Sequence, residues 1–238
     1  MNLTSNSEYL AGSAFSNGLR VQISGAESMI PYRMEVIERI VEKKDIIHFG
    51  CADHIEIIEA KIAKNIWFHK RLLSCANKCI GIDNNKSAVD FLKSKLSIPD
   101  LYCLNIDKEE IPSEITGRHY EFLILGEIIE HVDNPVMFLN TVHNKFKNHA
   151  DSIIITTPNA FRWNNFKNAF KQVEIINSDH RYWFTPYTLS KVLYQAGYNE
   201  IDFQLVENFR PEKSSILKNS LFCRFPSFRD TILIQAKF

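Results

Sequence analysis

Short apolar runs that alternate with amphipathic stretches constrain the fold of this chain more than any other feature. At residues 122–125 the run Phe-Leu-Ile-Leu continues without a polar position and stops at Gly126. A continuous run bounded by a turn residue is typical of a strand buried on both faces of a parallel sheet. We expect strands of this kind at residues 45–50, 79–83, 101–106, 120–125 and 152–157.

The stretches between these runs carry apolar residues at three- and four-residue steps, which is the period of a helix. We expect helices at residues 31–42, 55–76, 88–96, 136–146 and 186–196, and closing strands at residues 201–206 and 231–238. Strands that alternate with helices at this spacing predict βαβ units. The sequence therefore predicts an α/β fold with a mostly parallel, doubly wound sheet.

No repeat or linker divides the chain, so we interpret residues 1–238 as a single domain. Residues 1–28 are rich in Ser, Asn and Gly and predict an irregular arm or a cap over the core. Residues 207–230 form an excursion before the last strand, in which apolar residues lie among basic ones. A lid, a homodimer contact, a membrane-surface patch and an ordinary packed segment all agree with this pattern.

Charge and cysteine content exclude several classes of protein. Basic and acidic residues number 28 each, so the chain lacks the basic footprint of a general nucleic-acid binder. The five cysteines form no CxxC pair, which fits a reduced, cytoplasmic protein. The N-terminal segment does not resemble a signal peptide, and no apolar run reaches the roughly 18 residues that cross a membrane.

Small and acidic residues follow the expected strands. Gly50 comes after the first strand, Asp83 after the second and Asp107 after the third. Open α/β sheets bind ligands at this edge, where a carboxylate commonly accepts hydrogen bonds from ribose hydroxyls. Asp83 is therefore a candidate ribose ligand, and Asp107 is placed to meet the amine of an adenine. For both residues, capping of the next helix is the alternative.

The fourth strand is followed at once by Glu127, Glu130 and His131. In a helical turn this spacing puts the three side chains on one face, so they could act together. His180 lies later in the chain, just before the helix that begins at Pro186. Because imidazole titrates near neutrality, His131 and His180 are candidate general bases. Packing under the sheet edge is the alternative for His131.

Six motifs occur in an order and spacing that resemble one enzyme superfamily. They are HFGCAD, CIGIDNN, LNIDKEE, FLILGEIIEHVDNPVMFL, IIITTPNAF and DHRYWFTPYTLSKVLYQAGY. The set resembles class I S-adenosylmethionine-dependent methyltransferases, in the group of small-molecule enzymes that read EVIEHV and then TPN. The resemblance covers residues 31–206 and implies a Rossmann-like, seven-stranded sheet whose last strand is antiparallel.

This resemblance implies a cofactor site built from the strand ends. The residues that would bind S-adenosylmethionine are Gly50, Cys51, Ala52, Asp83, Asn84, Ile106, Asp107, Gly126 and Glu127. The chain departs from the family pattern at His48, where an acid is usual, and at Ala52 and His54, where glycines are usual. His54 would crowd the turn or reach toward the substrate.

The resemblance also implies roles for the residues after the fourth strand. ExxEH with a later histidine resembles small-RNA 2′-O-methyltransferases and ubiquinone-pathway O-methyltransferases, where the pattern supplies a divalent metal. Glu127, Glu130, His131 and His180 could thus hold Mg²⁺, Mn²⁺ or Zn²⁺. Without metal, Glu130, His131 and His180 are the candidate catalytic residues. Aromatic residues at 161, 163, 166 and 170 either cover an acceptor pocket or belong to the core.

These observations favour S-adenosylmethionine-dependent O-methylation of a small polar or sugar-like metabolite, as in surface-glycan or secondary-metabolite pathways. Metal-assisted 2′-O-methylation of RNA ends is the alternative within enzymes, and the zero net charge disfavours it. A non-catalytic module that binds the cofactor or a partner is the alternative outside enzymes, and the degenerate HFGCADH turn supports it.

Overall fold

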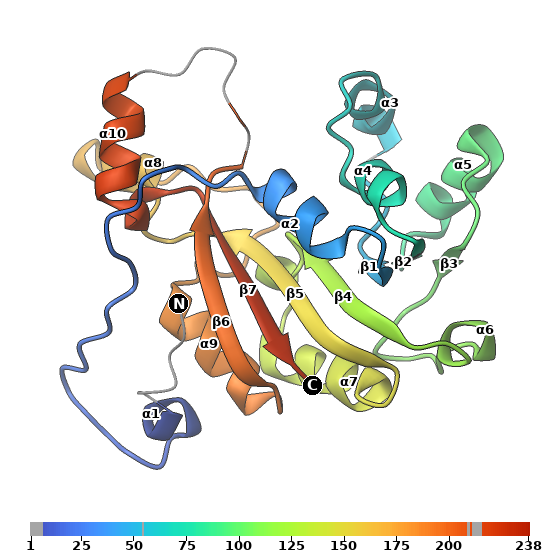
Figure 1. The fold of residues 1–238 in the computed structure, drawn as a ribbon, viewed down its shortest axis with the longest axis horizontal. Helices are drawn as coiled ribbons and strands as arrows, with labels where there is room; N and C mark the ends of the chain where they lie inside the picture. The colour runs from blue at the N-terminus through green and yellow to red at the C-terminus, as the bar shows by residue number, and fades with distance from the viewer. Residues whose placement is uncertain (1–6, 54, 209, 211–215) are drawn as a thin grey trace. The chain divides into compact units, whose positions relative to one another are not determined.

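The computed structural model describes residues 7–53, 55–208, 210 and 216–238 (Figure 1). Within these residues, seven strands form one sheet in the order β3-β2-β1-β4-β5-β7-β6. The strands are β1 (Asp45–Phe49), β2 (Lys78–Asp83), β3 (Leu101–Cys103), β4 (Tyr120–Gly126), β5 (Ala150–Pro158), β6 (Asn199–Val206) and β7 (Thr231–Lys237). β1 pairs in parallel with β2 and β4, β2 pairs in parallel with β3, and β7 runs antiparallel to β6. The predicted α/β sheet with an antiparallel last strand is confirmed.

Helices lie between the strands along most of the described chain. They are α1 (Ser7–Ala11), α2 (Arg33–Val41), α3 (Ile55–Ala63), α4 (Phe68–Cys75), α5 (Lys86–Leu96), α6 (Ser113–Thr116), α7 (Pro135–Phe146), α8 (Trp163–Phe170), α9 (Pro186–Gln195) and α10 (Ile216–Arg224), with 3₁₀ helices η2 (Ile129–His131) and η3 (Pro226–Phe228). No helix of the described residues combines the length and the apolar character needed to cross a bilayer.

The chain divides into two compact units. The first unit contains Met1–Val36, Glu127–Asn140 and Ile155–Lys237, and the second contains Ile37–Gly126, Thr141–Ile154 and Phe238. β1 to β4 belong to the second unit, β6 and β7 belong to the first, and β5 passes from one to the other. The interpretation of residues 1–238 as a single domain stays a prediction.

The second unit is organised around the continuous apolar strands. Ile46 and Ile47 of β1 and Leu123 and Ile124 of β4 are completely buried, which explains why these runs carry no polar position. The register pairs Phe49 with both Ile82 and Leu125. The residues that follow these three positions therefore leave the sheet at the same edge.

Two predicted elements of the second unit are wrong in length. The single helix expected at residues 55–76 is two helices, α3 and α4, because the chain turns at Asn65 with a left-handed φ of 54°. The third strand stops at Cys103 rather than at residue 106. The backbone N–H of Asp107 donates to the Asn105 side chain over 3.1 Å, and this local turn replaces strand pairing.

The first unit contains the antiparallel pair β6 and β7 and the helix α9. Thr185 and Thr188 form a capping box at the start of α9, as the Thr-Pro pair predicts, and Gly197 follows its end with a φ of 106°. Residues 1–28, predicted as an irregular arm or a cap, contain the helix α1. This helix packs against α9, where Lys191 donates to the carbonyl of Tyr9 over 3.1 Å.

The excursion at residues 207–230 contains α10 and η3, and residues 209 and 211–215 lie outside the described residues. Arg229, at its end, is completely buried. Its guanidinium donates to Glu27 Oε2 over 2.8 Å and to the carbonyls of Phe222 and Leu205. One side chain thus ties the N-terminal segment, α10 and β6 together within the first unit.

Candidate functional site

The carboxyl ends of β1, β2 and β4 form the predicted cofactor edge in the second unit. Gly50, Asp83 and Gly126 lie at this edge because their strands pair in register. Gly50 has a φ of 65°, a conformation that glycine adopts without strain, and its N–H donates to Ile82 over 2.8 Å. The chain therefore turns sharply where a cofactor of this fold class is bound.

The carboxylate of Asp83 faces the turn that follows β1. Its Oδ2 accepts from the Ala52 N–H over 3.0 Å, and its Oδ1 accepts from the Asn85 N–H over 2.9 Å. Burial raises the pKa of this carboxyl above its usual value. The residue that caps α5 is Asn85, whose side chain accepts from the Ala88 N–H over 3.2 Å. Asp83 is therefore not the N-cap of α5, which was the alternative role predicted for it.

This carboxylate fits the ribose of the expected cofactor. A carboxylate has about four lone-pair sites, so the backbone donors at Ala52, Asn84 and Asn85 leave acceptor capacity for a ribose hydroxyl. Asn84, beside it, is exposed, as is Asp107, whereas Ile106 is buried.

Cys51, which was expected to bind the cofactor, has its side chain in the core. Its side chain is 1% exposed and packs in a core cluster with Ile58, Trp67 and Leu101. Burial raises the pKa of its thiol well above the ordinary value. A Cβ on Gly81 would lie 2.8 Å from this sulfur, so glycine at position 81 makes room for it. The thiol of Cys51 therefore belongs to the core.

A buried histidine occupies the place where an acid is usual. His48 is 2% exposed, and its Nδ1 lies 3.1 Å from Nδ1 of His69. Burial lowers the pKa of His69 to about 4, so at neutral pH this imidazole is uncharged. The Phe68 ring packs edge-on against His48 and also lies 2.6 Å from where a Cβ of Gly126 would be. Glycine at position 126 is therefore required by packing against Phe68.

His54 lies outside the described residues, so its expected effect on the turn stays a prediction. Phe68 is not predicted as a site residue, because nothing in the sequence indicates that a helix begins there. A left-handed Asn65 shortly before it is the structural cause.

Three residues predicted for catalysis come together in the first unit. One ligand atom from each of Glu130, His131 and His180 can lie within 4.8 Å of the others. The rings of His131 and His180 meet edge-on with centroids 4.6 Å apart, and His180 Nε2 is 4.0 Å from Glu130 Oε1. We call this group the EHH cluster.

Glu130 is the buried member of the EHH cluster. Its side chain has no exposed surface, and its Oε2 accepts from the Thr157 hydroxyl over 2.9 Å. Burial, and then the charge of Glu127, raise the pKa of Glu130 to about 8. Burial also lowers the pKa of His180, and the neighbouring His131 adds to this shift. At neutral pH the pair is thus a largely protonated carboxyl beside a neutral imidazole.

Glu127 does not join the EHH cluster. It precedes the 3₁₀ turn η2 and has a left-handed φ of 56°, so the expected single helical turn from residue 127 to residue 131 is wrong at its first residue. Its carboxylate pairs instead with Arg33, whose Nη1 lies 2.9 Å from Oε1. The sequence offered no signal for Arg33. Thr157 could have been found, because it precedes the Pro-Asn pair of the TPN motif.

Comparisons with known proteins agree with this geometry. A family model described as a methyltransferase domain matches residues 24–202, which is more than half of the chain. No curated protein is similar enough to match.

Several solved structures share the fold. A small RNA methyltransferase, HEN1, aligns with a TM-score of 0.58 and 15% identity over 93% of this chain and 27% of that chain. A S-adenosylmethionine-dependent methyltransferase from Mesorhizobium loti has a TM-score of 0.52 and 13% identity over 86% of this chain and 95% of that one. A S-adenosylmethionine-dependent methyltransferase from Aquifex aeolicus has a TM-score of 0.52 and 12% identity over 87% of this chain and 89% of that one.

Identities this low show a shared fold, while the family model covers most of the residues that build the strand ends and the EHH cluster. The chain therefore belongs to the methyltransferase-domain family and is a class I S-adenosylmethionine-dependent methyltransferase.

Proposed function

We propose that this enzyme methylates a hydroxyl oxygen of a small polar or sugar-like acceptor, and that the EHH cluster activates this hydroxyl. The single observation that supports the proposal is the convergence of Glu130, His131 and His180 within 4.8 Å. A sulfonium is already an activated methyl donor, so the enzyme mainly aligns donor and acceptor. A hydroxyl acceptor also needs help in losing its proton.

On the cofactor side, we propose that the ends of β1, β2 and β4 hold S-adenosylmethionine. Asp83 would accept from the ribose hydroxyls, and the backbone of Gly50, Cys51 and Ala52 would line the methionine part. Asn84, Ile106 and Asp107 would surround the adenine, and Gly126 and Glu127 would border the methyl donor. The turn at Gly50 and the remaining acceptor capacity of Asp83 support this assignment.

On the acceptor side, His180 is the best-placed proton acceptor. Its lowered pKa keeps the imidazole neutral, and its Nδ1 is buried without a hydrogen-bond partner among the described residues. His131 Nδ1 lies 3.2 Å from the carbonyl of Asp179, which orients that ring. Glu130, held by Thr157, would position the neighbouring imidazole or share its proton.

The same donor set fits a divalent cation. One buried carboxylate oxygen and two imidazoles are the mixed oxygen and nitrogen ligands that Mg²⁺, Mn²⁺ or Zn²⁺ accept. Glu130 Oε1 is buried without a hydrogen-bond partner among the described residues, as expected of a group kept for a ligand. A bound cation would lower the pKa of the acceptor hydroxyl. Glu127, paired with Arg33, is outside this set.

A second candidate function is metal-assisted 2′-O-methylation of RNA ends. The EHH cluster and the fold shared with the small RNA methyltransferase HEN1 favour it. The zero net charge argues against it, because RNA binding is usually supported by basic surface.

Calorimetry with S-adenosylmethionine and S-adenosylhomocysteine tests the cofactor side of the proposal. We expect wild type to bind both, and Asp83→Asn to bind at least about tenfold more weakly because one hydroxyl acceptor is lost. Asp90→Asn, an exposed change on α5, is the matched control and should bind as wild type does. If wild type bound neither compound, the protein would be the non-catalytic module and the proposal would fail.

Transfer of a labelled methyl group tests the acceptor side. Polyhydroxylated metabolites, alkyl glycosides and RNA with a terminal vicinal diol serve as acceptors, each with and without chelator. We expect methylation of a small acceptor, and Glu130→Gln should reduce it by about a hundredfold, the usual size of an acid–base contribution. Methylation of RNA alone would favour the second candidate. Full activity of Glu130→Gln with chelator present would rule out both proposed roles of the EHH cluster, which are proton transfer from the acceptor hydroxyl and binding of a divalent cation.

We further propose a cytoplasmic location and, less directly, a homodimer. Cysteines 51, 75, 79, 103 and 223 are all free thiols, as expected in a reducing compartment. Ile216 and Leu217 of α10 are more than 80% exposed, which suits a contact surface. Light scattering of the purified protein would distinguish monomer from dimer.

A further inference from the structure

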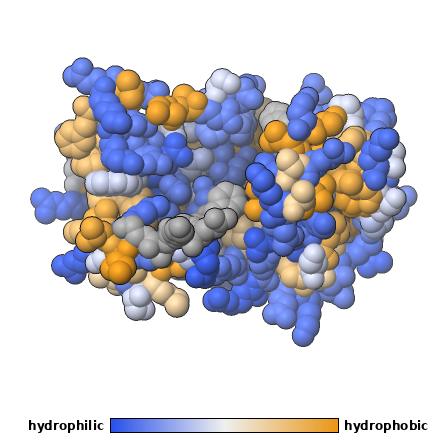
Figure 2. All heavy atoms as spheres, turned by 90° about the horizontal axis from the view of Figure 1, so that it is seen from above, coloured by the Kyte–Doolittle hydropathy of each residue, from blue (hydrophilic) through white to orange (hydrophobic). Residues whose placement is uncertain are grey.

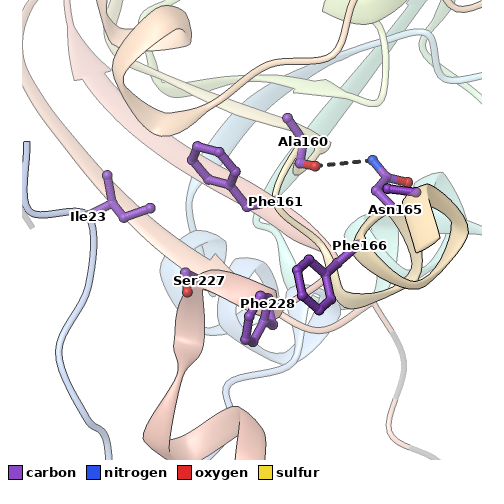
Figure 3. Close-up of a pocket in the computed structure, with 8 residues that line it drawn as sticks. Ile23, Ala160, Phe161, Asn165, Phe166, Ser227 and Phe228 are labelled. Carbon is purple, nitrogen blue, oxygen red and sulfur yellow. Dashed lines mark hydrogen bonds between the residues drawn. The ribbon is translucent and has the colours of Figure 1, made fainter. Parts of the chain in front are cut away.

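An apolar pocket lies in the first unit beside α8 and η3. Its volume is about 550 Å³, within the range of small-molecule sites, and Ile23, Phe161, Phe166, Ala169, Ser227 and Phe228 line it. Figure 3 shows the rings of Phe161, Phe166 and Phe228 around the space, with Ile23 from the N-terminal segment at its side. No charged residue lines it among the described ones.

One buried amide fixes two walls of this pocket. Asn159 is completely buried, and its Nδ2 donates to the carbonyls of Ser227 and Arg229, each over 2.8 Å. Its Oδ1 accepts from the Phe161 N–H over 3.1 Å. The turn that carries Phe161 and the segment that carries Ser227 are thus held at a set separation.

Arg229 fixes the third wall. Its Nη1 donates to Glu27 Oε2 over 2.8 Å, and its Nη2 donates to the carbonyl of Phe222 over 3.0 Å. Glu27 lies four residues after Ile23, so the N-terminal segment is held where Ile23 can close the pocket. Buried polar side chains thus hold three of the segments that line the pocket, and α8 supplies the fourth.

Residues that line the pocket and residues that contact the EHH cluster are neighbours along the same segments of the first unit. Thr157, which donates to Glu130, and Ala160, which lines the pocket, lie three residues apart at the end of β5. The Arg162 guanidinium lies 4.7 Å from the centre of the Trp183 ring, and that ring lies 6.3 Å from the His180 ring.

The pocket's apolar side chains are accessible to solvent. Phe161 and Phe166 are 46% and 44% exposed, so their assignment to the core, one of the two sequence interpretations, is wrong. Figure 2 shows hydrophobic side chains at the surface among hydrophilic ones on its left side, where α8 and α10 lie. When a ligand covers apolar surface of this kind and removes it from water, the free energy of the complex falls.

We propose that this pocket binds a hydrocarbon or aromatic group carried by the methyl acceptor. The inference rests on the proposed function, because it places the acceptor hydroxyl at the EHH cluster. The acceptor is then an amphiphile, with its reactive hydroxyl at Glu130, His131 and His180 and its apolar group between Ile23 and the three phenylalanine rings. A sugar-like acceptor would carry such a group as a substituent.

The test is calorimetric titration with methyl, butyl, hexyl and octyl β-D-glucosides below their micelle-forming concentrations. We expect affinity to rise about threefold to fourfold for each methylene that the pocket buries. Ala169→Glu puts a charge into the pocket from an exposed helical position and should weaken octyl glucoside binding at least tenfold. Asn164→Glu puts the same charge on the opposite face of α8 and should bind as wild type does.

A second readout links the pocket to the EHH cluster. Octyl glucoside should shift the NMR signals of the His180 imidazole in wild type but not in Ala169→Glu. Equal affinity across the glucoside series, equal loss in both variants, or an unmoved His180 signal would overturn the inference. Because binding needs no methyl transfer, these outcomes are distinct from a failure of the proposed function, which shows as loss of S-adenosylmethionine binding.

Discussion

At the scale of single residues, Glu130 is unusual because it is a carboxyl with no exposed surface. The sequence indicated three acidic or imidazole residues near β4 without showing which would be buried. In the structure Glu130 has no exposed surface, whereas Glu127 reaches Arg33 and His131 is half-buried. Burial cannot be read from spacing alone, since it depends on segments such as Thr157 and His180 that come later in the chain.

The raised pKa of Glu130 predicts a pH-dependent stability. The folded carboxyl keeps its proton up to about pH 8, while the unfolded one loses it near 4.5. Between these values the folded state binds more protons, so stability falls as the pH rises. Because glutamine does not ionise, Glu130→Gln removes this fall in stability with pH. Its thermal midpoint should therefore exceed that of wild type by more at about pH 8 than at about pH 5.

The matched control for this prediction is Glu59→Gln, an exposed change on α3. Its midpoint should follow wild type at every pH. A constant difference between Glu130→Gln and wild type across the pH range would show that Glu130 is ionised in the folded protein.

At the scale of elements, helix and strand types followed from periodicity, and their ends followed from local capping where a capping signal exists. The Thr-Pro pair at the start of α9 is such a signal. The break between α3 and α4 and the early end of β3 had no comparable signal. Both depend on backbone conformations, at Asn65 and around Asn105, that neighbouring packing can impose.

The capping box of α9 supports a prediction at this scale. Thr185→Ala removes the acceptor of the Thr188 N–H, which lies 3.2 Å from the Thr185 hydroxyl. The free energy of unfolding should fall by about 1 kcal/mol. Urea denaturation measures the change, and Thr185→Ser, which keeps the hydroxyl, should recover most of it. A Ser variant as unstable as the Ala variant would point to lost packing of the methyl group instead.

At the scale of the whole molecule, the two compact units differ in what holds them. The second unit depends on apolar strands, and the first depends also on buried polar side chains such as Arg229 and Asn159. Both of these residues satisfy backbone carbonyls of distant segments. They were not recognised from sequence, because neither periodicity nor motif spacing records which carbonyls end up without a partner.

Arg229→Met should destabilise the protein strongly. The change leaves the buried carbonyls of Phe222 and Leu205 without this donor, and two unpaired buried polar groups together cost about 3 kcal/mol. Urea denaturation gives the free energy of unfolding. The control is Arg210→Met, since the ion pair of Arg210 with Glu35 is exposed and should contribute little. Equal effects of the two changes would contradict the structural role of Arg229.

The sequence by itself determined the fold class, the order of the strands along the chain, and the residue types of the candidate site. These follow from local rules: the period of apolar residues, the turn residues that bound them, and motifs whose members are close along the chain. Only the tertiary structure decided that Glu130, His131 and His180 converge while Glu127 pairs with Arg33. It also decided that Ile23, Phe161 and Phe228 share one pocket. The physical reason is that burial and contact between distant segments are set by how the whole chain packs.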